Sequence, residues 1–230
     1  MKSHHTDRVY AGKLSLINDR LRAMAHRVEA MIADAMHALT DRDEALARKV
    51  MADDLEINRM EIDTDELCLR TLARWQPMAS DLRFLTLAMK MVTDLERIGD
   101  LAVNIAERAI DLSREPPLGE YVELPRMAQI TREMLRDAIE CFVDRDAVKA
   151  SRVIERDDEV DALYVKIFQE LLNMMRADPA NIHRGIHVQS VAKWIERIGD
   201  HATNLAEEII FMVEGQDVRH PWARRMGEEE

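Results

Sequence analysis

Apolar residues recur in alternating steps of three and four along three long stretches of the chain. This spacing puts them on one face of an α-helix, as a stripe that can pack against neighbouring helices. The pattern therefore predicts long amphipathic helices in all three stretches. The stripes consist of Leu14, Ile17, Leu21, Met24, Val28, Met31, Ala35 and Ala38; of Phe84, Ala88, Met91, Leu95, Ile98, Ala102, Ile105, Ala109 and Leu112; and of Val188, Val191, Ile195, Ile198, Ala202, Leu205, Ile209 and Met212.

Polar clusters and prolines interrupt the helical pattern and set the expected boundaries. Asp41–Asp43 can cap a second helix, which we expect to run to Trp75, before Pro77. A fourth helix is expected over about 124–143, and a fifth is expected to end near Ala177, before Asp178-Pro179. The segment Pro116-Pro117-Leu118-Gly119 marks the boundary between two halves, 1–115 and 116–230. From Gly215 onward the sequence is polar, and we expect a loose tail.

The two halves contain the same motif. The segments Glu96–Glu107 and Glu196–Glu207 agree at nine of twelve positions, one hundred residues apart. The polar run at Asp144–Val148 similarly repeats Asp41–Ala45, at a spacing of 103. The change in spacing indicates a net three-residue deletion in the second half, between its fifth and sixth expected helices or close by. The sequence therefore predicts an all-α fold, a tandem pseudo-symmetric pair of three-helix bundles with long antiparallel helices.

The composition supports a helical protein, and the net charge limits the classes of molecule that the protein is expected to bind. The 230 residues include only 7 Gly and 6 Pro, with 4% aromatic residues. A net charge of −12 argues against nucleic acid and suits cations or a basic partner. The segment Met1–Arg8 lacks the apolar core of a signal peptide, and no apolar run reaches the ~18 residues of a membrane span. We expect a cytoplasmic protein with Cys68 and Cys141 as buried free thiols.

Each repeated motif holds two acids four residues apart, on one side of a helix. They are Glu96 with Asp100 and Glu196 with Asp200. The two carboxylates of such a pair repel each other. Because both halves keep this unfavourable spacing, we expect a cationic partner beside each pair. On the helical wheel these acids lie opposite the apolar stripe, as an outward carboxylate ladder. Gly99 and Gly199 each cost about 1 kcal/mol inside a helix, which indicates close approach by another chain segment or space beside the acids.

A further polar pair recurs on the preceding helix of each half. It is Asp157 with Asp161 in the second half and Asp54 with Asn58 in the first. Carboxylates from two adjacent helices could converge as hard oxygen ligands, which suit Mg²⁺, Ca²⁺, Mn²⁺ or iron better than zinc. Against this stands the ordinary interpretation that charged helix faces are solvated. A ferritin-like di-iron centre is disfavoured because the chain lacks a Glu-x-x-His motif.

Other candidate chemistry is weaker. His183 and His187 are four apart on a helix without an acid in register, so we interpret them as exposed or partner-facing. There is no Gly-rich phosphate loop, nucleophile elbow or Ser/His/Asp set. A carboxylate ladder on a convex face also lacks the dry cavity that acid–base catalysis requires. The sequence does not predict an enzyme.

Glu-Arg-Ile-Gly-Asp occurs twice, preceded by Gln76–Arg83 and followed by Gly215–His220. In these segments, and in order over nearly the whole chain, the sequence resembles the PhoU family. The resemblance implies a regulator of phosphate homeostasis that restrains the phosphate-starvation response and modulates phosphate uptake. The implied partners are the Pst phosphate transporter and a PhoR-type sensor histidine kinase at the inner membrane face. Membrane contact would occur only through these partners, and we also expect a homodimer.

The resemblance also bears on metals. Some family members bind multinuclear metal clusters through Glu/Asp-x-x-x-Asp motifs, which match Glu96/Asp100, Glu196/Asp200 and Asp157/Asp161 here. In the pair Asp54/Asn58 an amide replaces the second acid, so that site is expected to bind less tightly. The metal implied is iron, manganese, zinc, magnesium or calcium. The alternative function is a metal store or metal-dependent enzyme, and the resemblance favours the regulator.

Overall fold

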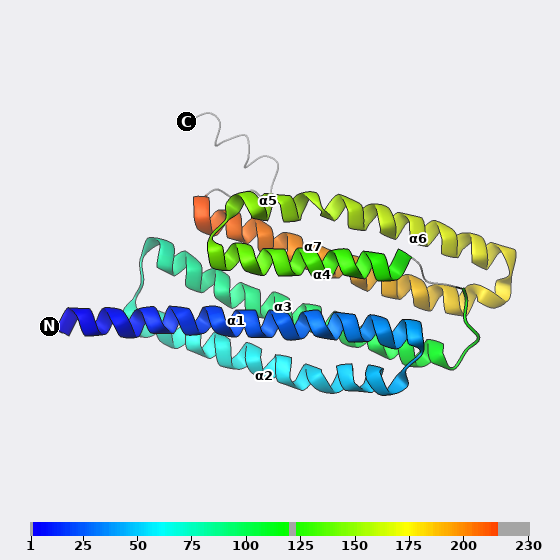
Figure 1. Cartoon of the computed structure of the whole chain (residues 1–230), viewed down its shortest axis with the longest axis horizontal. Coiled ribbons are helices and arrows are strands. Elements are labelled where there is room, and N and C mark those ends of the chain that lie inside the picture. The colour runs from blue at the N-terminus through cyan, green and yellow to red at the C-terminus, as the bar shows by residue number, and fades with distance from the viewer. Residues whose placement is uncertain (1, 120–122, 216–230) are drawn as a thin grey trace, which may run out of the picture.

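The computed structural model describes residues 2–119 and 123–215, and the side chains from residue 8 onward. The expected tail thus falls almost wholly outside the described residues. Within them the chain forms helices and no strand (Figure 1). The elements are α1 (Lys2–Asp41), α2 (Glu44–Trp75), α3 (Ala79–Ser113), α4 (Glu123–Asp144), α5 (Ala147–Glu155), α6 (Asp157–Ala177), the 3-10 turn η1 (Pro179–Asn181) and α7 (Ile182–Glu214). Over the described ranges, no helix is both long enough and apolar enough to cross a membrane.

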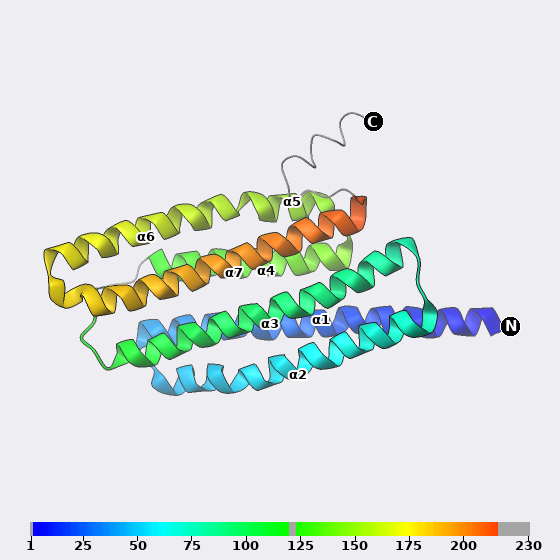
Figure 2. The ribbon, with the colours of Figure 1, turned by 180° about the vertical axis from the view of Figure 1, so that it is seen from behind.

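The helices form two antiparallel bundles that lie side by side, as Figures 1 and 2 show. One bundle contains α1, α2 and α3, and the other contains α4, α5, α6 and α7. The bundles meet where α3 packs on α7 and α1 packs on α4. Helix α2 lies at one outer edge, and α5 and α6 lie at the other (Figure 2). The predicted all-helical architecture is confirmed.

Equivalent caps begin the second helix of each half. The Asp43 carboxylate accepts a hydrogen bond from the Leu46 backbone N–H at 3.0 Å, and Asp146 accepts one from Lys149 N–H at 2.9 Å. These bonds satisfy a donor that the first helical turn leaves free. The residue before each cap has positive φ, 59° at Arg42 and 55° at Arg145. The repeated polar segments Asp41–Ala45 and Asp144–Val148 therefore form the same type of capped turn in each half.

The second half differs from the first at Arg156. The predicted single fifth helix is divided here into α5 and α6, whereas its counterpart α2 is continuous. The Arg156 backbone N–H bonds to the carbonyl of Val153, three residues back, at 3.2 Å. Its guanidinium pairs with Glu133 at 2.6 Å and Asp137 at 3.3 Å, both on α4. These long-range ion pairs stabilise a tight turn that the local sequence does not indicate.

The predicted stripes form the core. Every stripe residue is buried except Leu14, which is partly buried. One continuous apolar cluster runs through both bundles, and Phe84 of α3 stacks on Phe142 of α4 at 5.1 Å between ring centroids. The thiols of Cys68 and Cys141 are buried and free as predicted, and burial raises their pKa to about 12 and about 11. They are therefore packing groups without thiolate reactivity.

Candidate functional site

The first acid cluster lies between α2 and α3. Asp54 and Asn58 come from α2, and Glu96 and Asp100 come from α3. The Asn58 amide donates to Asp54 Oδ2 at 3.0 Å. Arg97 lies 3.5 Å from the Asp100 carboxylate and 3.6 Å from that of Glu96. The motif arginine therefore offsets part of the local negative charge, as an exposed side chain that solvent screens.

The second cluster repeats this arrangement between α6 and α7, with one more acid. Asp157 and Asp161 begin α6, and Glu196 and Asp200 lie on α7. Here the cation beside the motif is Lys193, whose ammonium bonds to Glu196. Because Asp161 replaces the neutral Asn58, this cluster carries four carboxylates against three in the first.

The two motif glycines set how closely the helices pack. A Cβ at Gly99 would lie 3.4 Å from Ile57 Cγ2 and 3.7 Å from Asp54 Oδ1. A Cβ at Gly199 would lie 3.4 Å from both Asp157 Oδ1 and Val160 Cγ1. Asp54 and Ile57 correspond to Asp157 and Val160 across the repeat, and at Gly199 the added Cβ would also lie 3.5 Å from Thr131 Cγ2. The expected role of the glycines is therefore met: they bring the aspartate of one helix against the backbone of the next.

Burial raises the pKa of several cluster acids, because removing a carboxylate from water disfavours its charged form. Burial and then the charge of Asp100 raise the pKa of Asp54 and of Glu96. Burial, followed by the charges of Asp161 and Asp200, raises the pKa of Asp157 to about 6. The pKa of Asp200 is raised by burial and by Glu196. The clusters thus hold negative charge at a free-energy cost that protons or cations would relieve.

Some oxygens in the clusters have no protein partner. Asp54 Oδ1, Asn58 Oδ1 and Glu196 Oε2 are buried without a hydrogen bond from any described residue. Buried acceptors of this kind normally find a donor or an ion, and carboxylate and amide oxygens suit a hard divalent cation. However, no three His, Cys, Asp or Glu side chains in the described ranges are arranged to hold a metal ion. The donor chemistry fits a cation, but the ligands are not gathered into a site.

The acids form the expected outward ladder only in part: Asp200 is exposed and the Asp100 side chain is 44% exposed, but the two glutamates are covered. The side chain of Glu96 is 18% exposed and that of Glu196 is 13% exposed. Each faces the adjoining helix of its own half, because α3 and α7 are surrounded by neighbours on most sides. A helical wheel distinguishes one apolar face but cannot show that a second helix covers the polar one. The prediction of an outward position was therefore wrong for Glu96 and Glu196.

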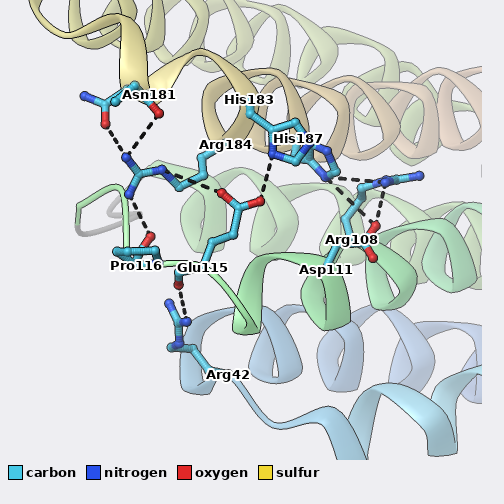
Figure 3. Close-up of polar contacts among 10 residues, drawn as sticks. Arg42, Arg108, Asp111, Glu115, Pro116, Asn181, His183, Arg184 and His187 are labelled. Carbon is cyan, nitrogen blue, oxygen red and sulfur yellow. Dashed lines mark hydrogen bonds and ion pairs between the residues drawn. The ribbon is translucent and has the colours of Figure 1, made fainter.

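A separate cluster of histidines, arginines and acids joins the halves where α3 ends beside the start of α7 (Figure 3). His183 Nδ1 lies 2.8 Å from the Glu115 carboxylate, and His187 Nδ1 lies 4.0 Å from that of Asp111. The Arg108 guanidinium pairs with Asp111 at 2.6 Å and reaches His187 Nδ1 at 3.4 Å. Burial, followed by the charges of Arg108 and His183, lowers the pKa of His187.

The histidines therefore have acidic neighbours, contrary to the interpretation from sequence. His183 is exposed as expected, at 68%, whereas His187 is only 16% exposed. Their partners lie about seventy residues earlier in the chain, in the first half. Only the repeated-bundle topology brings the end of α3 to the start of α7, so no local motif could reveal this cluster.

Comparison with known proteins identifies the family. The family model described as PhoU domain matches residues 21–109 and 124–209. A Pseudomonas putida protein named phosphate-specific transport system accessory protein PhoU homolog is 42% identical over 97% of this chain and 88% of its own. An Aquifex aeolicus protein with the same name is 42% identical over 94% of this chain and 98% of its own.

Two solved structures share the fold. The crystal structure of PhoU from Pseudomonas aeruginosa superposes with a TM-score of 0.86 at 40% identity, covering 90% of this chain and 99% of that one. The phosphate transport system regulatory protein PhoU from Streptococcus pneumoniae gives 0.84 at 25% identity, covering 92% and 100%. With two matched repeats and relatives aligned along nearly their full length, the chain belongs to the PhoU family.

Proposed function

We propose that the protein is a regulator of phosphate homeostasis that represses the phosphate-starvation response and modulates uptake through a phosphate-specific transport system. The observation that carries this proposal is the full-length match to relatives named as accessory proteins of such a system. The chain also contains both copies of the acidic motif, and its two-bundle fold covers 99% of the Pseudomonas aeruginosa structure.

The proposed partners are the Pst transporter and a PhoR-type sensor kinase, which the protein would contact from the cytoplasmic side of the membrane. A protein with a net charge of −12 is attracted to basic surfaces over a distance of about 10 Å at moderate salt. Association with these partners should therefore weaken as the salt concentration rises.

We propose a binding role and no catalytic one. The polar clusters consist of paired acids and ion pairs, which suit recognition and charge regulation. A metal store or a metal-dependent enzyme remains the alternative function. The absence of a gathered three-ligand group in the described residues gives that alternative no support.

A reporter for phosphate-starvation genes in a deletion strain tests the proposal. In high phosphate the strain should express the reporter, and the wild-type chain should restore repression. Asp100→Lys and Asp200→Lys should fail to repress if the acid clusters carry the function. Glu107→Lys is the matched control, because this exposed acid lies on α3 within the same motif but outside the cluster.

The outcomes separate two claims. Normal repression in the deletion strain would overturn the regulatory function itself. Normal repression by a folded Asp100→Lys or Asp200→Lys variant would overturn only the assignment of the function to the acid clusters. Purifying the tagged chain from cells grown in high and low phosphate identifies which of the two partners it binds.

A further inference from the structure

A groove in the first bundle is lined mainly by basic side chains. It lies between α1 and α2, which run antiparallel side by side (Figures 1 and 2), and has a volume of about 500 Å³. In the whole chain the acids outnumber the bases by 44 to 32, but in this groove the bases outnumber the acids by four to two. The groove therefore has the opposite sign of charge to the chain as a whole. These residues are Lys13, Arg20, Arg70 and Arg74, with Asp63 and Glu66.

Two contacts fix how the helices face each other across the groove. Arg20 donates to the Asp63 carbonyl at 2.7 Å. One end farther along, the ring centroids of Tyr10 and Trp75 lie 5.8 Å apart. In this antiparallel register Lys13 of α1 lies opposite the helical turn 70–74 of α2.

Three cations therefore gather at one end of the groove. Arg70 and Arg74 are four residues apart on one side of α2, about 6 Å along the helix axis, and Lys13 lies opposite them. Arg70 pairs with Glu66. Neither Lys13 nor Arg74 has an ion pair with a described carboxylate, and the Arg74 guanidinium lies over the Trp75 ring, with its Cζ 4.8 Å from the centroid. This end of the groove thus carries positive charge that the described residues do not neutralise.

The second half repeats the helix contact with its charges reversed. At a spacing of 103 residues, Arg20 and Asp63 correspond to Glu123 and Lys166. The side chains of Glu123 and Lys166 pair with each other, so α4 meets α6 where α1 meets α2. The two contacts confirm that the grooves can be compared position by position.

The cations themselves are not repeated. Asn173 and Ala177 take the positions of Arg70 and Arg74 in the second half. The second bundle packs in the same way without them, so helix packing does not require this group of charges. Binding of an anion gives a reason for their position in the first half.

We propose that the groove between α1 and α2 binds a small soluble ligand that carries two or more linked phosphate groups. A phosphate group carries between one and two negative charges near neutral pH, and the planar fork of arginine matches its oxygens. Lys13, Arg70 and Arg74 surround the place of one phosphate group. Arg20 lies about 10 Å from Lys13 along α1, and its N–H donors that do not bond to Asp63 suit a neighbouring phosphate group.

The arrangement favours phosphate groups over the carboxylates of an acidic peptide. Peptide carboxylates carry one charge each and are spread along a chain, whereas Lys13, Arg70 and Arg74 lie around one point. The groove is also of small-molecule size, since pockets for such ligands have volumes of about 300 to 1,000 Å³. Its positive field would raise the local concentration of an anion that the rest of this acidic chain repels.

Glu66 competes with the proposed ligand. Its carboxylate holds the Arg70 guanidinium in the structure, and a phosphate group would have to displace it. Glu66→Gln should therefore tighten binding, by about threefold for the loss of one exposed ion pair. A variant that strengthens binding cannot be explained by a damaged fold.

Isothermal titration of the full chain with tripolyphosphate tests the site. The buffer is free of metal ions, because a divalent cation could bridge the probe to the acid clusters, and its ionic strength is low. The wild-type chain should bind the probe. Lys13→Gln and Arg74→Gln should each raise the dissociation constant about tenfold, through the loss of one charged contact.

Arg59→Gln is the matched control. It removes the same charge from an exposed position on α2 that does not line the groove, so it should leave the affinity unchanged. Circular dichroism verifies that all four variants are folded. Added salt should weaken binding to the wild-type chain, because it screens the charges of the groove.

Two further probes represent the other occupants. Titration with a tri-glutamate peptide represents an acidic protein segment, and sedimentation with phosphatidylglycerol vesicles represents a membrane. Binding of tri-glutamate as tight as that of tripolyphosphate would overturn the proposal. An Arg74→Gln variant that loses vesicle binding and keeps its affinity for tripolyphosphate would overturn it as well.

A wild-type chain that does not bind tripolyphosphate would overturn the site directly. Unchanged affinity in both Lys13→Gln and Arg74→Gln, or weaker binding by Glu66→Gln, would do the same. The titrations use the purified chain and involve neither a transporter nor the reporter, so the site and the proposed function can fail independently.

Discussion

Asp157 of α6 packs directly against Gly199 of α7, where an added Cβ would sit 3.4 Å from the aspartate Oδ1. That distance is ordinary van der Waals contact, so the space admits a methyl group and nothing larger. The same holds at Gly99, whose added Cβ would lie 3.4 Å from Ile57 Cγ2. The two acid clusters are therefore built on helix contacts of the same tightness.

Gly199→Ala should accordingly be tolerated. Alanine favours a helix interior over glycine by about 1 kcal/mol, and its methyl group fits. We expect an increase in the free energy of unfolding of up to about 1 kcal/mol, measured by urea denaturation. Gly199→Leu should destabilise the protein by overpacking. A loss of stability in Gly199→Ala would show that α6 and α7 lie closer together than the structure indicates.

The contribution of Asp157 to the stability of the protein should fall as the pH rises from 4 to 6. Asp157 titrates near 3.8 when unfolded, and its pKa is raised to about 6 in the folded chain. Between these values the folded state binds more protons than the unfolded state, so deprotonation favours unfolding. The raised pKa values of Asp54, Glu96 and Asp200 act in the same direction.

The loss due to Asp157 should be about 1 kcal/mol, after allowance for the solvent that screens this partly exposed group. This loss of unfolding free energy should be fully present at pH 7, above the folded pKa of Asp157. Urea denaturation at pH 4, 5, 6 and 7 measures it. Asp157→Asn should flatten this part of the profile and be more stable than the wild type at pH 7. A wild-type profile that does not fall relative to that of Asp157→Asn over the same interval would contradict the assigned pKa.

Divalent cations should stabilise the protein at neutral pH if they bind the folded carboxylate clusters more tightly than the unfolded chain. Melting temperature in the presence of Mn²⁺ or Mg²⁺ measures the effect, and elemental analysis measures occupancy. Asp161→Asn gives the second cluster the composition of the first and should reduce the shift. Asn58→Asp should increase it. Glu107→Gln serves as the control, and equal shifts in all four proteins would exclude both clusters.

Truncating the stripes should destabilise both halves. Ile98 and Ile198 are each fully buried at equivalent places in α3 and α7. Replacing either by Ala should lower the free energy of unfolding by about 2 to 4 kcal/mol, through lost burial and the cavity that remains. Urea denaturation of the two variants gives the comparison. A cost below 1 kcal/mol for one of them would mean that the core closes around the missing atoms there.

The sequence predicted the helices and the core because these depend on period and local caps. The stripe residues from Phe84 to Leu112 are all buried, and α2 begins after the Asp43 cap as expected. It did not predict the covering of Glu96, the turn at Arg156 or the acids beside His187. Each of these depends on side chains from another helix, which the pattern along one segment does not contain.

For the candidate site, the sequence selected residues that the structure places in two equivalent clusters. These residues could be selected from the sequence because Glu96 and Glu196 lie in near-identical segments, one in each half. Whether they hold metal stays a prediction, because it depends on how far side chains move when charge is neutralised.

The stacking of Phe84 on Phe142 has a consequence for the history of the gene. Once the two copies shared one apolar interior, neither could be deleted without exposing the surface that the other had covered. A chain cut at residue 119 would leave Phe84 and the α7-facing side of α3 in water, and its product should aggregate or seek a second copy to replace the lost half. We therefore expect the fused tandem to be the smallest unit that folds stably, even though each half carries its own acidic motif.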